Sequence, residues 1–144
     1  MKNLAQKRAK HALDKVNEII GNHANLNNKN FKSFAAGAPT IILQNGLGQA
    51  LAFWASKMKI DKYGHWNNEK YILDVIKSWF ANSENPLKFI KSNTDEKSFI
   101  TSLLDKDQAK YLEIQKETLA MLEWFKRYAN AFLSEEKKKE GNED

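Results

Sequence analysis

The chain has 144 residues, of which 42% are hydrophobic and 28% charged, and its net charge is +5. This balance indicates one soluble globular domain with a buried core and excludes an intrinsically disordered chain. No apolar run approaches the ~20 residues that span a bilayer, and no apolar block follows the basic N-terminus, so we expect neither a membrane span nor a secretory signal. The chain has no cysteine, which excludes disulfides, thiolate metal sites and cysteine nucleophiles. Together these features favour the cytoplasm.

The positive charge is concentrated in the N-terminal part of the chain. Residues 1–62 contain ten Lys or Arg and three Asp or Glu, a net of +7, whereas residues 63–144 contain thirteen and fifteen, a net of −2. A basic surface of this kind attracts nucleic acid. On charge alone, a lysine-rich solvated surface is the simpler interpretation.

Apolar residues recur at helical spacing along the chain and predict an all-α fold. We expect a single-domain bundle of about five to six helices over residues 1–133, followed by a charged, frayed tail over residues 134–144. The first helix runs from about Leu4 to Ile20, with most of its lysines off the apolar stripe. The members of that stripe are Ala9, Ala12, Leu13, Val16, Ile19 and Ile20.

A second and a third helix are predicted to meet at a glycine-containing corner. Apolar residues continue at spacings of three and four over residues 31–42. Pro39 lies inside this pattern and must either kink the helix or begin its second half, because proline has no N–H and crowds the preceding turn. Residues 45–46, Asn-Gly, suit the left-handed conformation that ends a helix. The third helix then begins at residue 47 and ends near residue 59.

The fourth helix is predicted over residues 68–81, with Asn67 as its N-cap. Residues 83–86 break it, because they are polar and end in proline. Residues 87–91 are expected to form a single turn.

Two further helices complete the predicted bundle. Either Asn93 or Thr94 caps a short fifth helix, and either Asp105 or Asp107 begins the longest helix, which reaches at least Leu133. The apolar residues of the fifth helix are Phe99, Ile100, Leu103 and Leu104. Those of the sixth include Tyr111, Leu112, Leu119, Leu122, Phe125, Ala129 and Phe132.

The corner QNGLGQ, residues 44–49, lacks the residues of a phosphate-binding loop. A Walker motif needs a lysine and a hydroxyl residue after the last glycine, and neither follows Gly48. A dinucleotide-binding fingerprint needs a preceding strand and a third glycine, which are also missing. We therefore predict that the corner allows two helices to pack closely. The N–H groups of Leu47 and Gly48 remain available for one backbone phosphate.

No motif predicts catalysis or a metal site. None of His11, His23 and His65 belongs to a metal-binding helical motif of the HExxH kind. Glu113 and Glu117 are expected on a solvent-facing row beside lysines, where surface ion pairing explains them better than acid/base catalysis does. No serine has the context of an activated nucleophile. We expect no enzyme activity, no cofactor, no metal and no small-molecule substrate.

The last predicted helix combines aromatic and basic residues at its C-terminal end. Phe125 and Phe132 are expected in the core. Trp124 and Tyr128 widen this apolar face, which would suit a subunit contact. Aromatic residues interleaved with cations could instead stack on bases and hold phosphates. The cations of this segment are Lys126 and Arg127.

Three segments of the chain resemble one known family. They are QKRAKHALDKVNEI at 6–19, ILQNGLGQALAFWASK at 42–57 and EWFKRYANAFL at 123–133. In this order they resemble the small, all-helical subunit of the type III-B CRISPR (Cmr) effector complex. The matching segments cover less than half of the chain, and residues 59–107 carry no pattern that matches.

The resemblance implies a non-catalytic role in antiviral defence. Such subunits stack in a short filament beside the subunits that carry the guide RNA, and they line the groove where target RNA pairs with the guide. The implied partners are other Cmr subunits, further copies of this chain, and guide and target RNA bound by sequence-independent backbone contacts. Other subunits of such a ribonucleoprotein carry out the RNA cleavage.

The candidate nucleic-acid-binding residues are basic residues on the first helix, after the corner and on the last helix. They are Lys7, Arg8, Lys10, Lys15, Lys57, Lys126 and Arg127. Trp124 and Tyr128 are the interface candidates. Two other functions stay open: a helical protein–protein adaptor without nucleic-acid binding, and a small hydrolase or nuclease with an unrecognised site. The adaptor predicts salt-insensitive partner binding and no co-purifying RNA.

Overall fold

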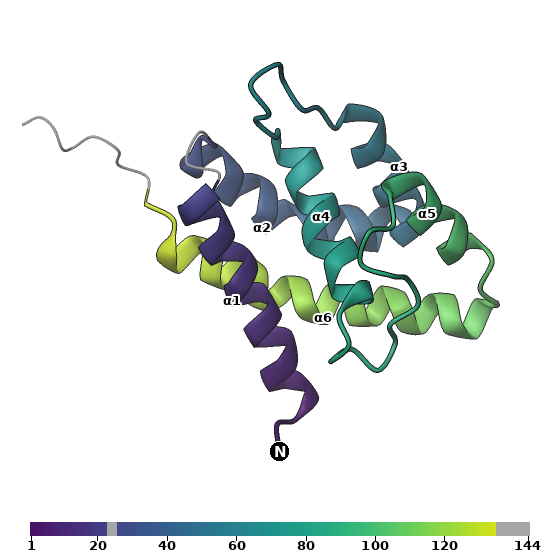
Figure 1. Cartoon of the computed structure of the whole chain (residues 1–144). Coiled ribbons are helices and arrows are strands. Elements are labelled where there is room, and N and C mark those ends of the chain that lie inside the picture. The colour runs from purple at the N-terminus through teal and green to yellow at the C-terminus, as the bar shows by residue number, and fades with distance from the viewer. Residues whose placement is uncertain (23–25, 135–144) are drawn as a thin grey trace, which may run out of the picture.

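The computed structural model describes residues 1–22 and 26–134, which form six helices in one bundle (Figure 1). The helices are α1 (Leu4–Asn22), α2 (Asn28–Asn45), α3 (Leu47–Lys57), α4 (Asn68–Ala81), α5 (Glu96–Leu104) and α6 (Gln108–Phe132). One isolated bridge pairs Ile60 with Trp66 in the loop between α3 and α4. The prediction of a single all-α domain is confirmed. His23 and residues 135–144 of the predicted tail lie outside the described residues.

The longest helix, α6, runs along one side of the bundle (Figure 1). Both α1 and α2 pack mainly against α6, while α3 packs against α4, α2 and α5. The helices at the two ends of the described bundle, α1 and α6, are therefore direct neighbours. Phe31 of α2 meets Tyr71 of α4 and Phe125 of α6 edge to face, with ring centroids 5.8 and 6.0 Å apart. These contacts join three helices in an apolar core, because edge-to-face packing is a favourable arrangement for aromatic rings.

Helix boundaries follow local capping chemistry. Asn67 caps α4 as predicted, and its side chain accepts a hydrogen bond from the N–H of Lys70. Asp107 caps α6. The cap of α5 is Asp95, whose side chain accepts from the N–H of Ser98, so the prediction of Asn93 or Thr94 was wrong by one or two residues. A carboxylate at this position accepts a hydrogen bond from a free N–H of the first turn. Its negative charge also interacts favourably with the positive end of the helix dipole.

A single helix, α2, contains Pro39, which is buried in the bundle. One other segment differs from expectation, because residues 87–91 do not form the expected single turn. The buried side chain of Asn85 holds this part of the chain instead, by donating to the carbonyl of Trp79 at 3.0 Å and accepting from the N–H of Leu87 at 2.9 Å. An amide with both a donor and an acceptor can replace the backbone bonds that a helical turn would supply.

Several apolar residues that the helical pattern assigns to the core lie on the surface. Phe132, expected in the core, is 54% exposed. It is the last residue of α6 and extends beyond the helices packed against it, whereas Phe125, two turns earlier, is fully buried. Helical periodicity gives the direction of a side chain but not whether a neighbour covers it. The other exposed members of the predicted stripes are Ile20, Leu104 and Leu112.

Candidate nucleic-acid interface

Arg8 forms a buried ion pair that joins three helices. Its Nε and Nη2 atoms donate to the two carboxylate oxygens of Glu117 on α6, at 2.6 and 2.8 Å. Trp79 Nε1 on α4 donates to the same carboxylate at 3.0 Å. The side-chain hydrogen bond to Glu117 raises the pKa of Arg8. A two-bond pair of this kind is geometrically specific, and it commits the guanidinium to the core rather than to phosphate.

The expected position of Glu117 on a solvent-facing row was wrong. The residue is 3% exposed and lies between α1, α4 and α6. Spacing along α6 placed it four residues after the exposed Glu113 but could not show that α1 covers its side chain. The carboxylate is buried because a cation and an indole N–H satisfy it.

Lys15 is also held within the protein. It is 7% exposed, and its Nζ lies 2.7 Å from a carboxylate oxygen of Asp74 on α4 and 2.9 Å from one of Glu18. Burial opposes the charged ammonium, but the two carboxylates outweigh it, so the pKa of Lys15 is raised. This lysine connects α1 to α4 and has little surface left for a ligand.

His11 belongs to the same helix interface. Its Nε2 lies 3.0 Å from the carbonyl oxygen of Val75, to which it can donate, and its ring centroid lies 5.2 Å from that of Trp79. Burial lowers the pKa of His11. No cluster of three His, Cys, Asp or Glu side chains that could hold a metal ion occurs within residues 1–22 and 26–134. The structure thus gives this histidine a packing role.

The four remaining candidate cations on α1 and α6 lie nearer the surface, and each has a single carboxylate partner. Lys7 pairs with Glu84 at 3.4 Å and Lys10 with Asp14 at 2.8 Å. Lys126 and Arg127 share Glu123, at 3.3 and 3.7 Å. The Arg127 side chain is 72% exposed. Exposed pairs of this kind contribute little to stability and exchange readily with other anions.

Lys57 differs from all of these residues because it has no carboxylate partner among the described side chains. It is exposed at the last position of α3, where its Nζ lies 5.4 Å from the ring centroid of Phe53. Lys59 and Lys62 follow in the α3–α4 loop, and both are likewise exposed without an ion pair in the described part of the chain. Neither lysine is among the nucleic-acid-binding residues predicted from the sequence. The signal for them was their place in the basic half, outside any predicted helix stripe.

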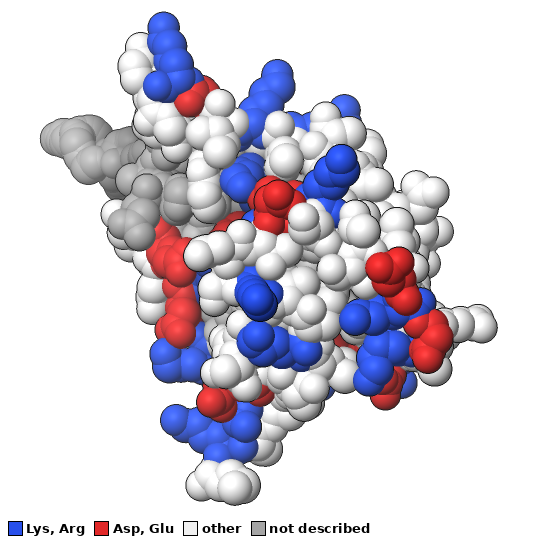
Figure 2. Space-filling model, turned by 45° about the vertical axis from the view of Figure 1, so that its right-hand side comes forward, with Lys and Arg blue, Asp and Glu red and all other residues white. Residues whose placement is uncertain are grey.

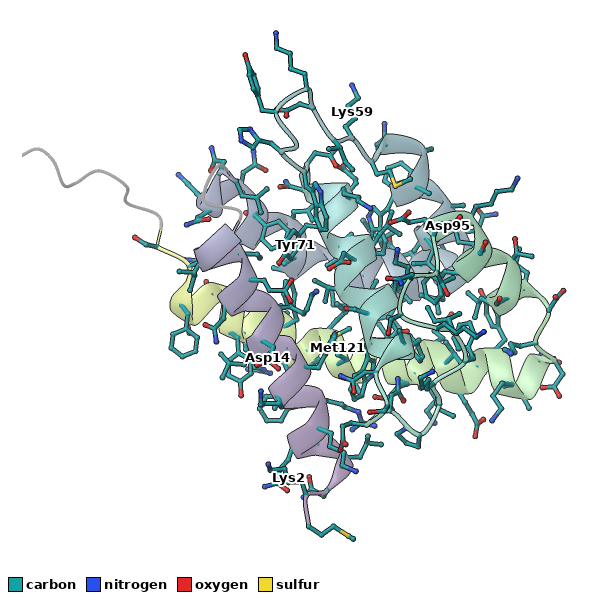
Figure 3. The ribbon with its side chains drawn as sticks, viewed as in Figure 1. Lys2, Asp14, Lys59, Tyr71, Asp95 and Met121 are labelled. Carbon is teal, nitrogen blue, oxygen red and sulfur yellow. The ribbon has the colours of Figure 1, made fainter. Side chains whose placement is uncertain are left out.

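Folding redistributes the charge asymmetry of the sequence. Three basic residues of the N-terminal half (Lys7, Arg8 and Lys15) pair with carboxylates of the C-terminal half. Figure 2 accordingly shows positive and negative groups interspersed over one face of the molecule. In Figure 3, Lys2 before α1 and Lys59 in the α3–α4 loop lie at opposite ends of the bundle. Unpaired positive charge is therefore local, and its clearest concentration is the segment with Lys57, Lys59 and Lys62.

The glycine corner, residues 44–49, packs directly against α6. The N–H of Leu47 donates to Gln115 Oε1 at 2.8 Å, and that of Gly48 donates to the Tyr111 hydroxyl at 2.7 Å. The expectation that these groups are free for phosphate was wrong, because α6 supplies both acceptors. A Cβ at Gly48 would lie 3.1 Å from the same hydroxyl, which explains the close approach of the corner to α6.

The two interface candidates line one edge of α6. The ring centroids of Trp124 and Tyr128 are 5.9 Å apart, and those of Tyr128 and Phe132 are 6.0 Å apart. Trp124 and Tyr128 are partly buried against the core, while Phe132 is exposed. The three rings form a continuous aromatic edge that is open to solvent at its C-terminal end.

Comparison with known proteins agrees with this architecture. The family model described as "CRISPR-associated protein (Cas_Cmr5)" matches residues 4–132. A protein of Thermus thermophilus named "CRISPR system Cmr subunit Cmr5" is 27% identical over 135 residues, which cover 94% of this chain and 100% of that protein. The X-ray crystal structure of a CRISPR-associated Cmr5 family protein from Thermus thermophilus has the same fold, with a TM-score of 0.67, 24% identity, and coverage of 93% of this chain and 100% of that one. No helix within the described residues is long and apolar enough to cross a membrane. Because the family model spans nearly the whole bundle, the chain belongs to the Cmr5 family of CRISPR-associated proteins.

Proposed function

We propose that the chain is a non-catalytic small subunit of a type III-B CRISPR (Cmr) effector in the cytoplasm. The observation that carries the proposal is the match of the family model to residues 4–132. The relative named as a Cmr subunit is matched over its whole length. We assign the chemistry of the complex to its other subunits, with base pairing to the guide supplying the sequence specificity.

The proposed contacts to guide and target RNA are electrostatic. Cations at the surface can neutralise phosphates without reading bases, whereas cations held in close ion pairs between helices are already neutralised. The geometry therefore removes Arg8 and Lys15 from the proposed phosphate-contacting set. The cations that remain in this set are Lys7, Lys10, Lys57, Lys126 and Arg127.

We further propose that copies of the chain stack as a filament within the complex and also contact other Cmr subunits. The aromatic edge of Trp124, Tyr128 and Phe132 supports this proposal. Aromatic side chains are enriched at protein interfaces, and Phe132 exposes 54% of its surface in the single chain. Association would cover this ring.

The test is recovery of the tagged chain from its own cells, with the co-purifying proteins and RNA identified. Large CRISPR effector subunits and a guide RNA are expected in the same fraction. Recovery with unrelated proteins and no RNA would contradict the proposal and favour the adaptor function. Metal-dependent turnover that is lost on removal of one carboxylate or histidine would favour a nuclease or hydrolase.

A charge reversal tests the role of the surface cations. Lys57→Glu is expected to weaken RNA retention and to lower the log–log salt slope by about 0.7 for each phosphate of a single strand that is no longer neutralised. Lys116→Glu is the matched control, because it makes the same charge change at an exposed position of α6 outside the proposed set. Equal RNA retention by both variants in normally assembled complexes would remove Lys57 from the interface.

A further inference from the structure

The loop between α3 and α4 has a defined shape. Asp61 Oδ1 accepts hydrogen bonds from the N–H groups of Tyr63 and His65, at 2.8 and 2.9 Å. The N–H of Asp61 donates to the carbonyl of His65, and the N–H of Gly64 donates to the carbonyl of Asp61, both at 2.9 Å. Gly64 has a φ of 82°, a conformation that side chains rarely adopt. These bonds close residues 61–65 into a tight turn.

The base of the loop is fixed to the bundle. The Asn67 side chain accepts from the N–H of Lys59 at 3.0 Å and donates to the carbonyl of Lys57 at 2.8 Å, while it also caps α4. Trp66 packs against the buried Tyr71 with ring centroids 5.5 Å apart. The turn is therefore anchored on both sides, and its tip is held in place before any ligand binds.

At the tip, this loop exposes a large aromatic ring that has no part in the core. Tyr63 is 72% exposed. Lys62 Nζ lies 5.3 Å from the centroid of its ring, and the centroid of the His65 ring lies 6.0 Å away. In Figure 3 the loop that carries Lys59 projects from one end of the bundle. An ordered, exposed aromatic ring beside a cation is the arrangement on which a nucleobase stacks.

The charge around Tyr63 favours a polyanionic ligand. Lys57, Lys59 and Lys62 lack ion pairs in the described part of the chain, whereas the neighbouring acid, Asp61, lies 3.4 Å from His65 Nδ1. The carboxylate of Asp61 is also directed to the amides of its own turn. Three cations without ion pairs in the described part of the chain therefore lie within six consecutive residues, 57–62.

We propose that the α3–α4 loop is a binding site for single-stranded RNA, in which Tyr63 stacks on a base and Lys57, Lys59 and Lys62 contact the adjacent phosphates. This inference rests on the proposed function and adds a base contact to it. Stacking does not depend on base identity, so the site remains sequence-independent. Phosphate neutralisation supplies the salt-dependent part of the affinity, and the tyrosine ring supplies a part that salt does not change.

The first experiment is an NMR titration of the full, isotope-labelled chain with an oligouridylate of about ten nucleotides, a length within the usual site size for single strands. Tyr63 ring signals, assigned with Tyr63→Phe, are expected to shift together with the amides of the loop. If no residue of the chain shifts, both the RNA-binding proposal and this inference are overturned. If the lysines of α1 or α6 shift while the loop does not, the RNA-binding proposal stands and this inference is overturned.

The second experiment separates stacking from charge. Tyr63→Ala is expected to weaken binding on the order of tenfold with an unchanged salt slope, and Tyr63→Phe to bind like the original chain. Against an abasic strand of the same length, all three chains should bind equally. Leu43→Ala is the control, since it removes a large apolar side chain on α2 that is 68% exposed, against 72% for Tyr63, and that lies outside the loop and the aromatic edge.

Other outcomes would overturn the inference. Equal affinity of Tyr63→Ala and the original chain for oligouridylate would show that no base stacks on this ring. Loss of co-purifying Cmr subunits with Tyr63→Ala, at unchanged RNA affinity, would assign the loop to a protein contact instead. Because Tyr63 is exposed, the variant should keep its helical circular dichroism, which the same preparations can verify.

Discussion

Replacement of Arg8 by methionine tests whether this residue is structural. The variant keeps an unbranched apolar stem but leaves the Glu117 carboxylate, which is 3% exposed, without its cation. Removing one partner of a buried ion pair costs about 3 kcal/mol or more in free energy of unfolding. The Arg8 side chain is 23% exposed, so water can reach part of the site and we take the lower value.

The assay is urea denaturation followed by circular dichroism. With a denaturant slope of about 2 kcal/mol/M, a loss of about 3 kcal/mol lowers the midpoint by about 1.5 M. Lys10→Met is the matched control on the same helix, because its ion pair with Asp14 is exposed and its removal should cost no more than about 0.5 kcal/mol.

A double variant isolates the electrostatic origin of the effect. Arg8→Met with Glu117→Gln removes the unpaired charge while leaving an oxygen that can accept from Trp79 Nε1. Its cost should therefore be clearly smaller than that of Arg8→Met alone. If Arg8→Met shifts the midpoint no more than the Lys10→Met control does, the ion pair is not what holds α1 on α6. Folded Arg8→Met should keep the RNA affinity of the original chain.

Three further predictions concern the corner, a cap and pH. Gly46→Ala should destabilise the fold by about 1–3 kcal/mol, because Gly46 has φ 83° and ψ 158°, a region that is essentially restricted to glycine; unchanged thermal unfolding would contradict this. Asn67→Ala should cost about 1–2 kcal/mol through loss of the α4 cap and should broaden the loop amide signals in NMR spectra, whereas Asn67→Asp should retain the cap and cost less. Burial lowers the pKa of His11, so the unfolded state binds the proton more readily than the folded state does, and the free energy of unfolding should fall as pH decreases below about 6.5. His11→Gln should flatten that part of the pH profile of stability. An identical profile in this variant would contradict the role of His11 in the pH dependence.

The sequence predicts the helices well because their signals are local. The apolar stripes and the caps at Asn67 and Asp107 act within a few residues, so the predicted boundaries of α4 agree with the structure. Local signals also compete, as at the start of α5, where Asn93, Thr94 and Asp95 are all acceptable caps and only Asp95 is used.

The candidate site was harder to predict because its decisive contacts are distant in sequence. Arg8 and Glu117 are separated by 109 residues, so no spacing rule connects them. The same holds for the amides of the corner, whose acceptors come from α6, 63 and 68 residues later. Sequence charge identified a basic half, but only the fold shows which cations are already paired. The family resemblance, carried by three short segments, did not depend on such contacts.

The packing of α1 and α2 on α6 constrains when these two helices can dock during synthesis of the chain. Both α1 and α2 pack mainly on α6, which is synthesised after the five helices that precede it. A nascent or truncated chain that stops before Gln108 would leave their apolar stripes uncovered and Arg8 without its carboxylate. Ordered docking of α1 and α2 must therefore wait for the synthesis of α6. Contacts between segments so far apart in sequence form slowly, and the intermediates that precede them expose apolar surface and are prone to aggregation.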